Sequence, residues 1–224
     1  VPFHGARTSD VASLVEIVAK AAPGVTLVGV GYSMGAIVLA NYLGVAGRQS
    51  PLSAAVSISG CYDGVANSKA LYGARAFEPF LAYELKQNFT AGYRGEILAA
   101  GGVDLAAATG AAVSSIQDFD AATVVRFFGF VDTDDYYRHL SVGHLGKLHR
   151  VSVPLLALHA VDDPVVDSDT FAPFLAARLP PNLFFLVSRL GGHVGWCEGW
   201  MPWRSRWGFQ NRAVFEFTDA VLSS

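Results

Sequence analysis

Residues 25–35 read VTLVGVGYSMG, and residues 36–43 continue as AIVLANYL. A run of β-branched and apolar residues, Val25–Val30, is typical of a buried strand. Glycines flank Ser33 in the turn that follows, and the apolar stretch from Met34 to about Leu43 predicts a helix that Gly44 and Gly47 end. The segment is therefore a strand, a tight glycine turn and a helix, with one serine at the centre of the turn.

Similar apolar runs recur on the C-terminal side of this segment and alternate with helical patterns. Alternation of apolar strands with helices predicts an α/β fold with a parallel sheet, right-handed crossovers and helices on its faces. The further strands are expected at Ala54–Ser59, Pro154–His159 and Leu183–Val187, and the further helices at Val11–Ala21, Thr170–Leu179 and Asn211–Leu222.

Between about residues 64 and 150 the pattern changes, because aromatic residues and glycines become frequent and the apolar spacing is helical. No linker rich in Pro or Ser brackets this part. We therefore expect one domain over residues 1–224, in which residues 64–150 are a helical cap insertion.

Composition excludes several classes of protein. The chain is 52% hydrophobic and 16% charged, with a net charge of −3 and no block of like charge, which argues against disorder and against nucleic acid as a partner. The uncharged stretch between Lys20 and Arg48 is long enough for a membrane span, but Pro23-Gly24 and the turn around Ser33 divide it. Cys61 and Cys197 are expected to be free, buried thiols; the alternative is one disulfide bond between them.

No signal-peptide pattern is found at the start of the chain, and this favours the cytoplasm or an organelle over secretion. The absence of an initiating Met suggests that the chain is a fragment. No cofactor or metal is expected, because His139, His144 and His149 recur every five residues and do not share one helix face.

The turn Gly31-Tyr32-Ser33-Met34-Gly35 matches G-x-S-x-G in the strand–turn–helix setting of a nucleophile elbow. We expect the turn to strain the backbone of Ser33, and side chains at the two glycines to collide with the strand and helix. The backbone N–H of Met34 would then bind a developing oxyanion. The alternative is a phosphate-binding turn, which the absence of G-x-G-x-x-G disfavours.

A serine needs a base, and His193 is the best candidate of six histidines. It lies in the loop Gly191-Gly192-His193-Val194-Gly195, after a predicted strand, and functional groups gather at the carboxyl ends of parallel strands. His159, by contrast, reads as a core residue of its strand.

The acid that orients the base should follow another strand, in the order Ser, Asp, His. Asp162 and Asp163 both occupy that place, and the spacing from Ala160 favours Asp163. The alternative interpretation is a solvated Asp-Asp-Pro turn. Three residues in the right order, each at the end of its own strand, favour a catalytic triad of Ser33, Asp163 and His193.

With the sequence around them, these residues resemble the YheT-like branch of the α/β hydrolases. The similar segments are VGVGYSMGAIVLANYLG (28–44), FDAATVVRFFGFVDTDDYYRHLS (119–141), VPLLALHAVDDPVV (153–166) and GGHVGWCEG (191–199). Family members include abhydrolase-domain lipases and plant embryogenesis-associated proteins. The resemblance implies a serine esterase or lipase without a cofactor, acting on a short-chain ester or on an acylglycerol or phospholipid.

One departure from the family pattern concerns the oxyanion hole. Members have a further N-terminal half-sheet with a His-Gly loop that supplies a second N–H. His4-Gly5 has no strand before it, so the hole is expected to be half built and the N-terminal strands to be missing. Acyl transfer by the same triad, and an impaired domain that binds a lipid or a partner, are the alternatives to hydrolysis.

Nine aromatic residues of the predicted cap would suit an acyl chain, although they equally suit the cap's own core. They are Phe77, Phe80, Phe89, Phe119, Phe127, Phe128, Phe130, Tyr136 and Tyr137.

Overall fold

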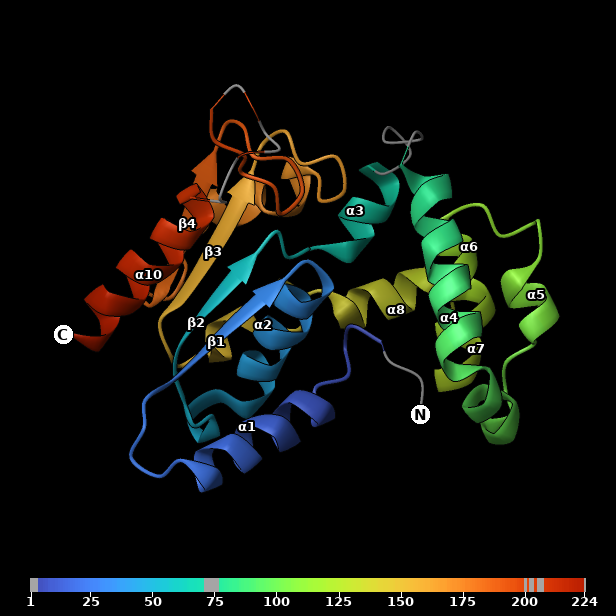
Figure 1. Cartoon of the computed structure of the whole chain (residues 1–224), viewed down its shortest axis with the longest axis horizontal. Coiled ribbons are helices and arrows are strands. Elements are labelled where there is room, and N and C mark those ends of the chain that lie inside the picture. The colour runs from blue at the N-terminus through green and yellow to red at the C-terminus, as the bar shows by residue number, and fades with distance from the viewer. Residues whose placement is uncertain (1–3, 71–76, 200, 202–203, 205–207, 224) are drawn as a thin grey trace.

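The computed structural model describes residues 4–70, 77–199, 201, 204 and 208–223. Its centre is a parallel sheet in which the four strands lie in their sequence order (Figure 1). The strands are β1 (Leu27–Tyr32), β2 (Leu52–Ile58), β3 (Leu155–Ala160) and β4 (Leu183–Ser188). The prediction of an α/β fold with a parallel sheet is therefore confirmed.

Helices cover the two faces of the sheet. Side chains alternate along each strand, so Ala55 and Ala157 face one core, while Val56 and Leu156 face the other. The first core is closed by α1 (Ser9–Ala21), α2 (Met34–Ala46) and Phe174 of α9 (Ala172–Ala176). The second is closed by Trp196 and α10 (Gly208–Leu222).

Two predicted helix ends were wrong. Helix α2 continues through Gly44 to Ala46, and only Gly47, at φ 52°, caps it. Gly44 is instead required by a close approach, since a Cβ there would lie 2.9 Å from the Cβ of Lys147. The helix expected over Thr170–Leu179 is reduced to a single 3₁₀ turn, η4 (Ser168–Thr170), and the short α9. Pro180 disfavours helical backbone at the residue before it.

Strand β1 lies at one edge of this sheet and pairs with β2 alone among the described residues. Its ladder runs from Leu27 beside Leu52 to Tyr32 beside Ile58. Helix α10 contacts β2 but leaves the same face of β1 open, so that 42% of Val30 and 45% of Tyr32 is exposed. Leu14 and Ile17 of the neighbouring helix α1 are also exposed.

A group of helices between β2 and β3 lies beside the carboxyl ends of the strands (Figure 1). Its longest member, α4, packs on α6, and α8 packs on α3 and η2. The group consists of α3 (Gly64–Ala70), α4 (Glu78–Ala100), α5 (Leu105–Thr109), α6 (Ile116–Asp120), the π-helical segment η2 (Ala121–Val125), α7 (Arg126–Phe128) and α8 (Thr133–Leu140). A 3₁₀ turn, η3 (Leu148–Arg150), leads into β3.

A buried polar junction joins these helices to α2. The side-chain amide of Asn41 donates to the carbonyl oxygens of Ile37, Gly5 and Leu140, at 3.1, 3.3 and 2.7 Å. The ammonium of Lys147 donates to Asn41 Oδ1 at 2.7 Å and to the His139 carbonyl. Because these groups are buried, each would cost free energy without its partner, and the junction therefore fixes α8 against α2.

Both cysteines are free, and Cys61 is buried, but Cys197 is exposed, so the expectation of a second buried thiol is wrong. None of the helices that the structure describes has the length and apolar character to cross a membrane. Within the same residues, His, Cys, Asp and Glu form no group that could hold a metal ion.

Candidate active site

Ser33 lies at the tip of the turn between β1 and α2, in a backbone conformation that is unusual for a residue with a side chain. Its φ and ψ are 50° and −118°. The turn is held from both sides, because the Ser33 N–H donates to the Ile58 carbonyl at 2.9 Å and the Ser33 carbonyl accepts from Ala36 and Ile37. Such strain persists only where the surrounding structure enforces it, and here it projects the Ser33 hydroxyl beyond the strand ends.

The two glycines of the motif have different roles. A Cβ at Gly31 would lie 2.5 Å from the carbonyl oxygen of Gly35, so no side chain fits between strand and helix there. A Cβ at Gly35 would meet no atom within 4 Å. The predicted steric reason therefore holds at Gly31 and is wrong at Gly35.

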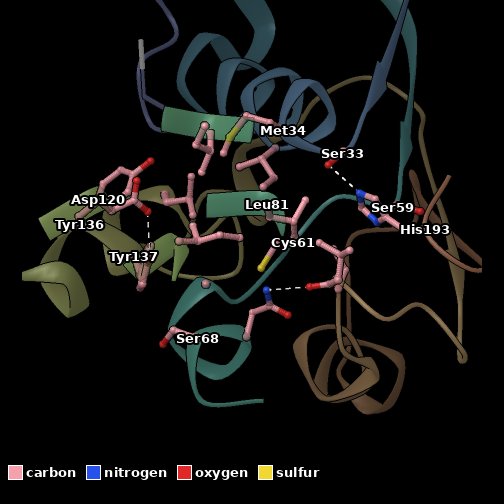
Figure 2. A pocket seen from close by; sticks show the side chains of 18 of the residues that line it. Ser33, Met34, Ser59, Cys61, Ser68, Leu81, Asp120, Tyr136, Tyr137 and His193 are labelled. Carbon is pink, nitrogen blue, oxygen red and sulfur yellow. Dashed lines mark hydrogen bonds between the residues drawn. The ribbon is translucent and has the colours of Figure 1, made fainter. Parts of the chain in front are cut away.

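His193 stands next to Ser33, in the loop after β4. Its Nε2 lies 2.8 Å from Ser33 Oγ, the distance of a hydrogen bond (Figure 2). Backbone N–H groups help to hold the loop: that of Val194 donates to Ser59 Oγ at 3.2 Å, and that of Trp196 donates to the Gly191 carbonyl at 2.8 Å.

Asp163 faces the other nitrogen of the same ring. His193 Nδ1 lies 2.9 Å from Asp163 Oδ2 and 3.1 Å from Oδ1. The N–H groups of Val165 and Val166 also donate to Oδ1, at 2.8 and 2.9 Å. Burial opposes ionisation of this carboxyl, but the hydrogen bonds from His193, Val166 and Val165 and the charge of the ring hold its pKa below the usual value. The carboxylate is thus both fixed and charged.

Asp162, the alternative acid, does not face the ring. Its Oδ1 accepts a hydrogen bond from the Gly192 N–H at 2.9 Å. Asp163 therefore contacts the side chain of His193, whereas Asp162 holds the backbone of the residue before it.

Met34 is the first residue of α2, so its N–H has no acceptor one turn earlier in the helix. It follows Ser33 directly and is available to an anion at the Ser33 side chain. The N–H of Gly5 is not, because it donates to the Tyr136 hydroxyl at 3.2 Å. The expectation that His4-Gly5 does not substitute for the second oxyanion loop agrees with this contact.

Known proteins are similar to this chain in sequence and in fold. Phospholipase ABHD3 from Mus musculus is 29% identical over 217 residues, which are 97% of this chain and 51% of the relative. YheT from Escherichia coli K12 is 29% identical, with 92% of this chain and 59% of the relative covered. Monoacylglycerol lipase from Saccharomyces cerevisiae is 26% identical, with coverages of 87% and 43%.

Among solved structures, BpoC from Mycobacterium tuberculosis superposes with a TM-score of 0.51 over 96% of this chain and 73% of its own, at 19% identity. The chain has the α/β-hydrolase fold, and its sequence is similar to those of YheT and of phospholipase ABHD3. No family model matches the sequence. The chain spans about half the length of the curated relatives that it matches.

A pocket of about 290 Å³ opens beside Ser33 and His193 (Figure 2). It lies between the strand ends and the helices from α3 to α8. Nine of the twenty described residues around it have apolar side chains: Met34, Ile37, Cys61, Leu81, Leu85, Ile116, Leu140, Val165 and Val166. The polar ones include Asn67, Glu84 and Asn88. The apolar part of this surface favours a hydrocarbon group of a substrate over a polar one.

Cys61 also lines the pocket and is a second conceivable nucleophile. Burial, followed by the charge of Asp63, raises the pKa of its thiol to about 12. The thiolate is the reactive form of cysteine, so Cys61 is a neutral, apolar part of the pocket wall.

The aromatic residues expected around an acyl chain lie in different parts of the structure. Tyr136 and Tyr137 line the pocket, whereas Phe128 and Phe130 pack in the core of the helical group. Phe119 is buried, Phe77 and Phe80 are exposed, and the side chain of Phe89 lies outside the described residues.

Sequence reasoning missed two contacts that hold the His193 loop, those from Ser59 and Asp162. Ser59 follows β2, adopts φ 51° and is fully buried. Its position directly after a strand was the available signal, since the carboxyl ends of parallel strands share one edge of the sheet.

Proposed function

We propose that this hydrolase cleaves carboxylic esters with Ser33 as nucleophile, His193 as base and Asp163 as the acid that orients the base. The observation that supports this most strongly is the continuous chain of contacts from Ser33 Oγ to His193 Nε2 at 2.8 Å and from His193 Nδ1 to Asp163 Oδ2 at 2.9 Å. A neutral imidazole between an alcohol and a carboxylate can remove the proton of the alcohol as its oxygen attacks a carbonyl carbon.

The proposed reaction has two steps. Ser33 Oγ forms a bond to the carbonyl carbon while its proton moves to His193 Nε2, and the Met34 N–H binds the oxyanion. The proton then passes to the departing alcohol, which leaves an acyl group on Ser33. Water, deprotonated by His193, releases the acid and restores the serine. The carboxylate of Asp163 stabilises the ring while it carries the extra proton.

We propose that the substrate is an ester or lipid whose acyl group enters the pocket beside Ser33. The apolar side chains of that pocket support this choice, and so do two relatives whose names are phospholipase and monoacylglycerol lipase. No cofactor takes part in the proposed steps.

We also propose that residues 1–224 act as one domain, with residues 64–150 as its cap. The pocket supports this, because Ser33 and His193 come from the strand ends, while Leu81, Ile116 and Tyr137 come from the helices between β2 and β3. A substrate in the pocket would contact both parts.

Hydrolysis of p-nitrophenyl butyrate by the 224-residue chain tests the proposed function, with Ser33→Ala as the comparison. Loss of the nucleophile should reduce kcat on the order of 10⁴-fold or more relative to the intact triad. Turnover by Ser33→Ala at the rate of the unchanged chain would show that Ser33 is not the nucleophile.

A further inference from the structure

The two ends of the pocket differ in chemistry. Ser33 and His193 lie at one end, and Asp120, Tyr136 and Tyr137 lie at the other, with Leu81 between them (Figure 2). Asp120 is the last residue of α6. A group that extends from Ser33 along the apolar walls therefore meets a carboxyl group at the far end.

The surroundings of Asp120 are unfavourable for a charge. The Tyr137 hydroxyl donates to Asp120 Oδ2 at 2.9 Å. In the part of the chain that the structure describes, no Lys, Arg or His forms an ion pair with Asp120. Burial raises the pKa of Asp120 to about 7, against the opposing effect of the Tyr137 hydrogen bond. Above neutral pH the carboxylate thus depends on the water of the pocket for the rest of its solvation.

We propose that Asp120 ends the acyl-binding part of the pocket and so limits the acyl chain length that this hydrolase accepts, an inference that rests on the proposed ester hydrolysis. A methylene group that packs on apolar walls contributes about 0.8 kcal/mol, or about fourfold in Kd. A methylene group that reaches Asp120 displaces water from a carboxylate and offers it no hydrogen bond, which is unfavourable. The gain in binding affinity per methylene group should therefore stop where the chain reaches Asp120.

The size of the pocket indicates where this limit lies. A volume of about 290 Å³, at about 30 Å³ for a group of the size of a water molecule, holds roughly ten such groups. An acyl chain should accordingly reach Asp120 at roughly eight to ten carbon atoms.

The contact with Tyr137 gives Asp120 a structural role as well, because it joins α6 to α8. Two variants separate the structural role from the limiting one. Asp120→Asn keeps the shape and an oxygen that accepts from Tyr137 but removes the charge. Tyr137→Phe removes the hydrogen bond and keeps the charge.

The experiment measures equilibrium binding of p-nitrophenyl esters from C4 to C14 at pH 8.5 in a Ser33→Ala background, where turnover does not interfere. With Asp120 present, affinity should rise about fourfold per methylene group and level off at roughly C8–C10. Asp120→Asn, and Asp120→Leu more strongly, should move that break to longer chains, with about tenfold tighter binding of C12. Tyr137→Phe should leave the break in place.

A break that stays at the same chain length in Asp120→Asn and Asp120→Leu would overturn the proposal. An equal shift in Tyr137→Phe would overturn it too, because packing and not charge would then set the limit. The kcat/KM profile of the same esters with Ser33 present distinguishes this proposal from the proposed function. Absence of turnover with a break that moves in the Asp120 variants would refute ester hydrolysis and leave the length limit standing.

Discussion

At the scale of single residues, two adjacent carboxylates do different work. Asp163 is 8% exposed, contacts both the His193 ring and two backbone N–H groups, and is ionised by those contacts. Asp162 binds the backbone of Gly192 one residue away from the same histidine. The pair thus offers a matched test, since an identical substitution removes charge from each.

Asp163→Asn should reduce kcat on the order of 10³–10⁴-fold, because an amide no longer stabilises the protonated His193 ring. Asp162→Asn should change kcat by less than about threefold, since the amide oxygen can still accept from Gly192. Steady-state kinetics on p-nitrophenyl butyrate measures both. Equal losses, or a larger loss at Asp162, would reverse the assignment.

His159 illustrates a residue whose protonation bears on stability. It is buried in β3, stacks on Phe171 at 4.4 Å between ring centroids, and its Nε2 has no partner among the described residues. Burial lowers its pKa to about 4, with the charge of Asp163 acting in the opposite direction. The unfolded chain therefore binds the proton first, and this histidine makes folding less favourable as the pH falls from 6.5 towards 4.

His159→Phe should remove that dependence. The free energy of unfolding of His159→Phe should rise relative to that of the unchanged chain as the pH falls from 6.5 to 4, by up to about 3 kcal/mol. Urea unfolding at several pH values measures the difference. The comparison isolates the effect of His159. The raised pKa of Asp120 makes folding more favourable as the pH falls, but Asp120 is present in both proteins and its effect cancels in the difference. A difference that is constant with pH would contradict the assignment.

At the scale of the element, the turn from β1 to α2 was predictable from sequence, and its details were not. A strand of β-branched residues followed by G-x-S-x-G identifies the turn, because few other residues tolerate its geometry. The two glycines look equivalent in the sequence, yet only Gly31 faces the backbone of Gly35 across the turn. The sequence does not show that helix α2 continues through Gly44, because the residue that requires a glycine there, Lys147, is about a hundred residues away.

Gly31→Ala and Gly35→Ala form a matched pair in this turn. Gly31→Ala should distort the turn, lower stability by about 1–3 kcal/mol and reduce kcat, because a methyl group would meet a backbone carbonyl at 2.5 Å. Gly35→Ala should be neutral or slightly stabilising, since it adds a better helix former in open space. Thermal unfolding together with ester turnover compares them. Equal effects would show that the turn relaxes around Gly31.

The polar pair at the far end of the pocket could not be foreseen from local patterns. Asp120 and Tyr137 are 17 residues apart and meet because η2, which follows α6 directly, packs on α8. The sequence places three triad candidates by their strand ends, but it contains no comparable signal for side chains on packed helices.

At the scale of the whole molecule, the sheet is covered unevenly. Helix α10 contacts β2 near the middle of one face, whereas the edge strand β1 exposes Val30 and Tyr32 on that face, and the other edge strand, β4, exposes Phe184 and Leu186. An apolar edge without a charge or Pro can pair with another chain. We therefore expect the 224-residue chain to self-associate.

Size-exclusion chromatography with light scattering at several concentrations tests this expectation. Val30→Lys should shift the chain towards monomer, because a charge on the edge opposes pairing. Val131→Lys, at an exposed position before α8, adds the same charge away from the edge and should have no effect. A monodisperse monomer at all concentrations without either change would contradict the expectation.

The central claim is that His193 and Asp163 activate Ser33, and the most direct measurement is covalent labelling by a fluorophosphonate, which reacts with an activated serine. Mass spectrometry of the digested, labelled chain should find the phosphonate on Ser33. The labelling rate should fall by orders of magnitude in His193→Ala, because His193 is the only base among the described residues that is hydrogen-bonded to Ser33 Oγ. Labelling at another residue, or labelling of Ser33 at an unchanged rate without His193, would contradict the account.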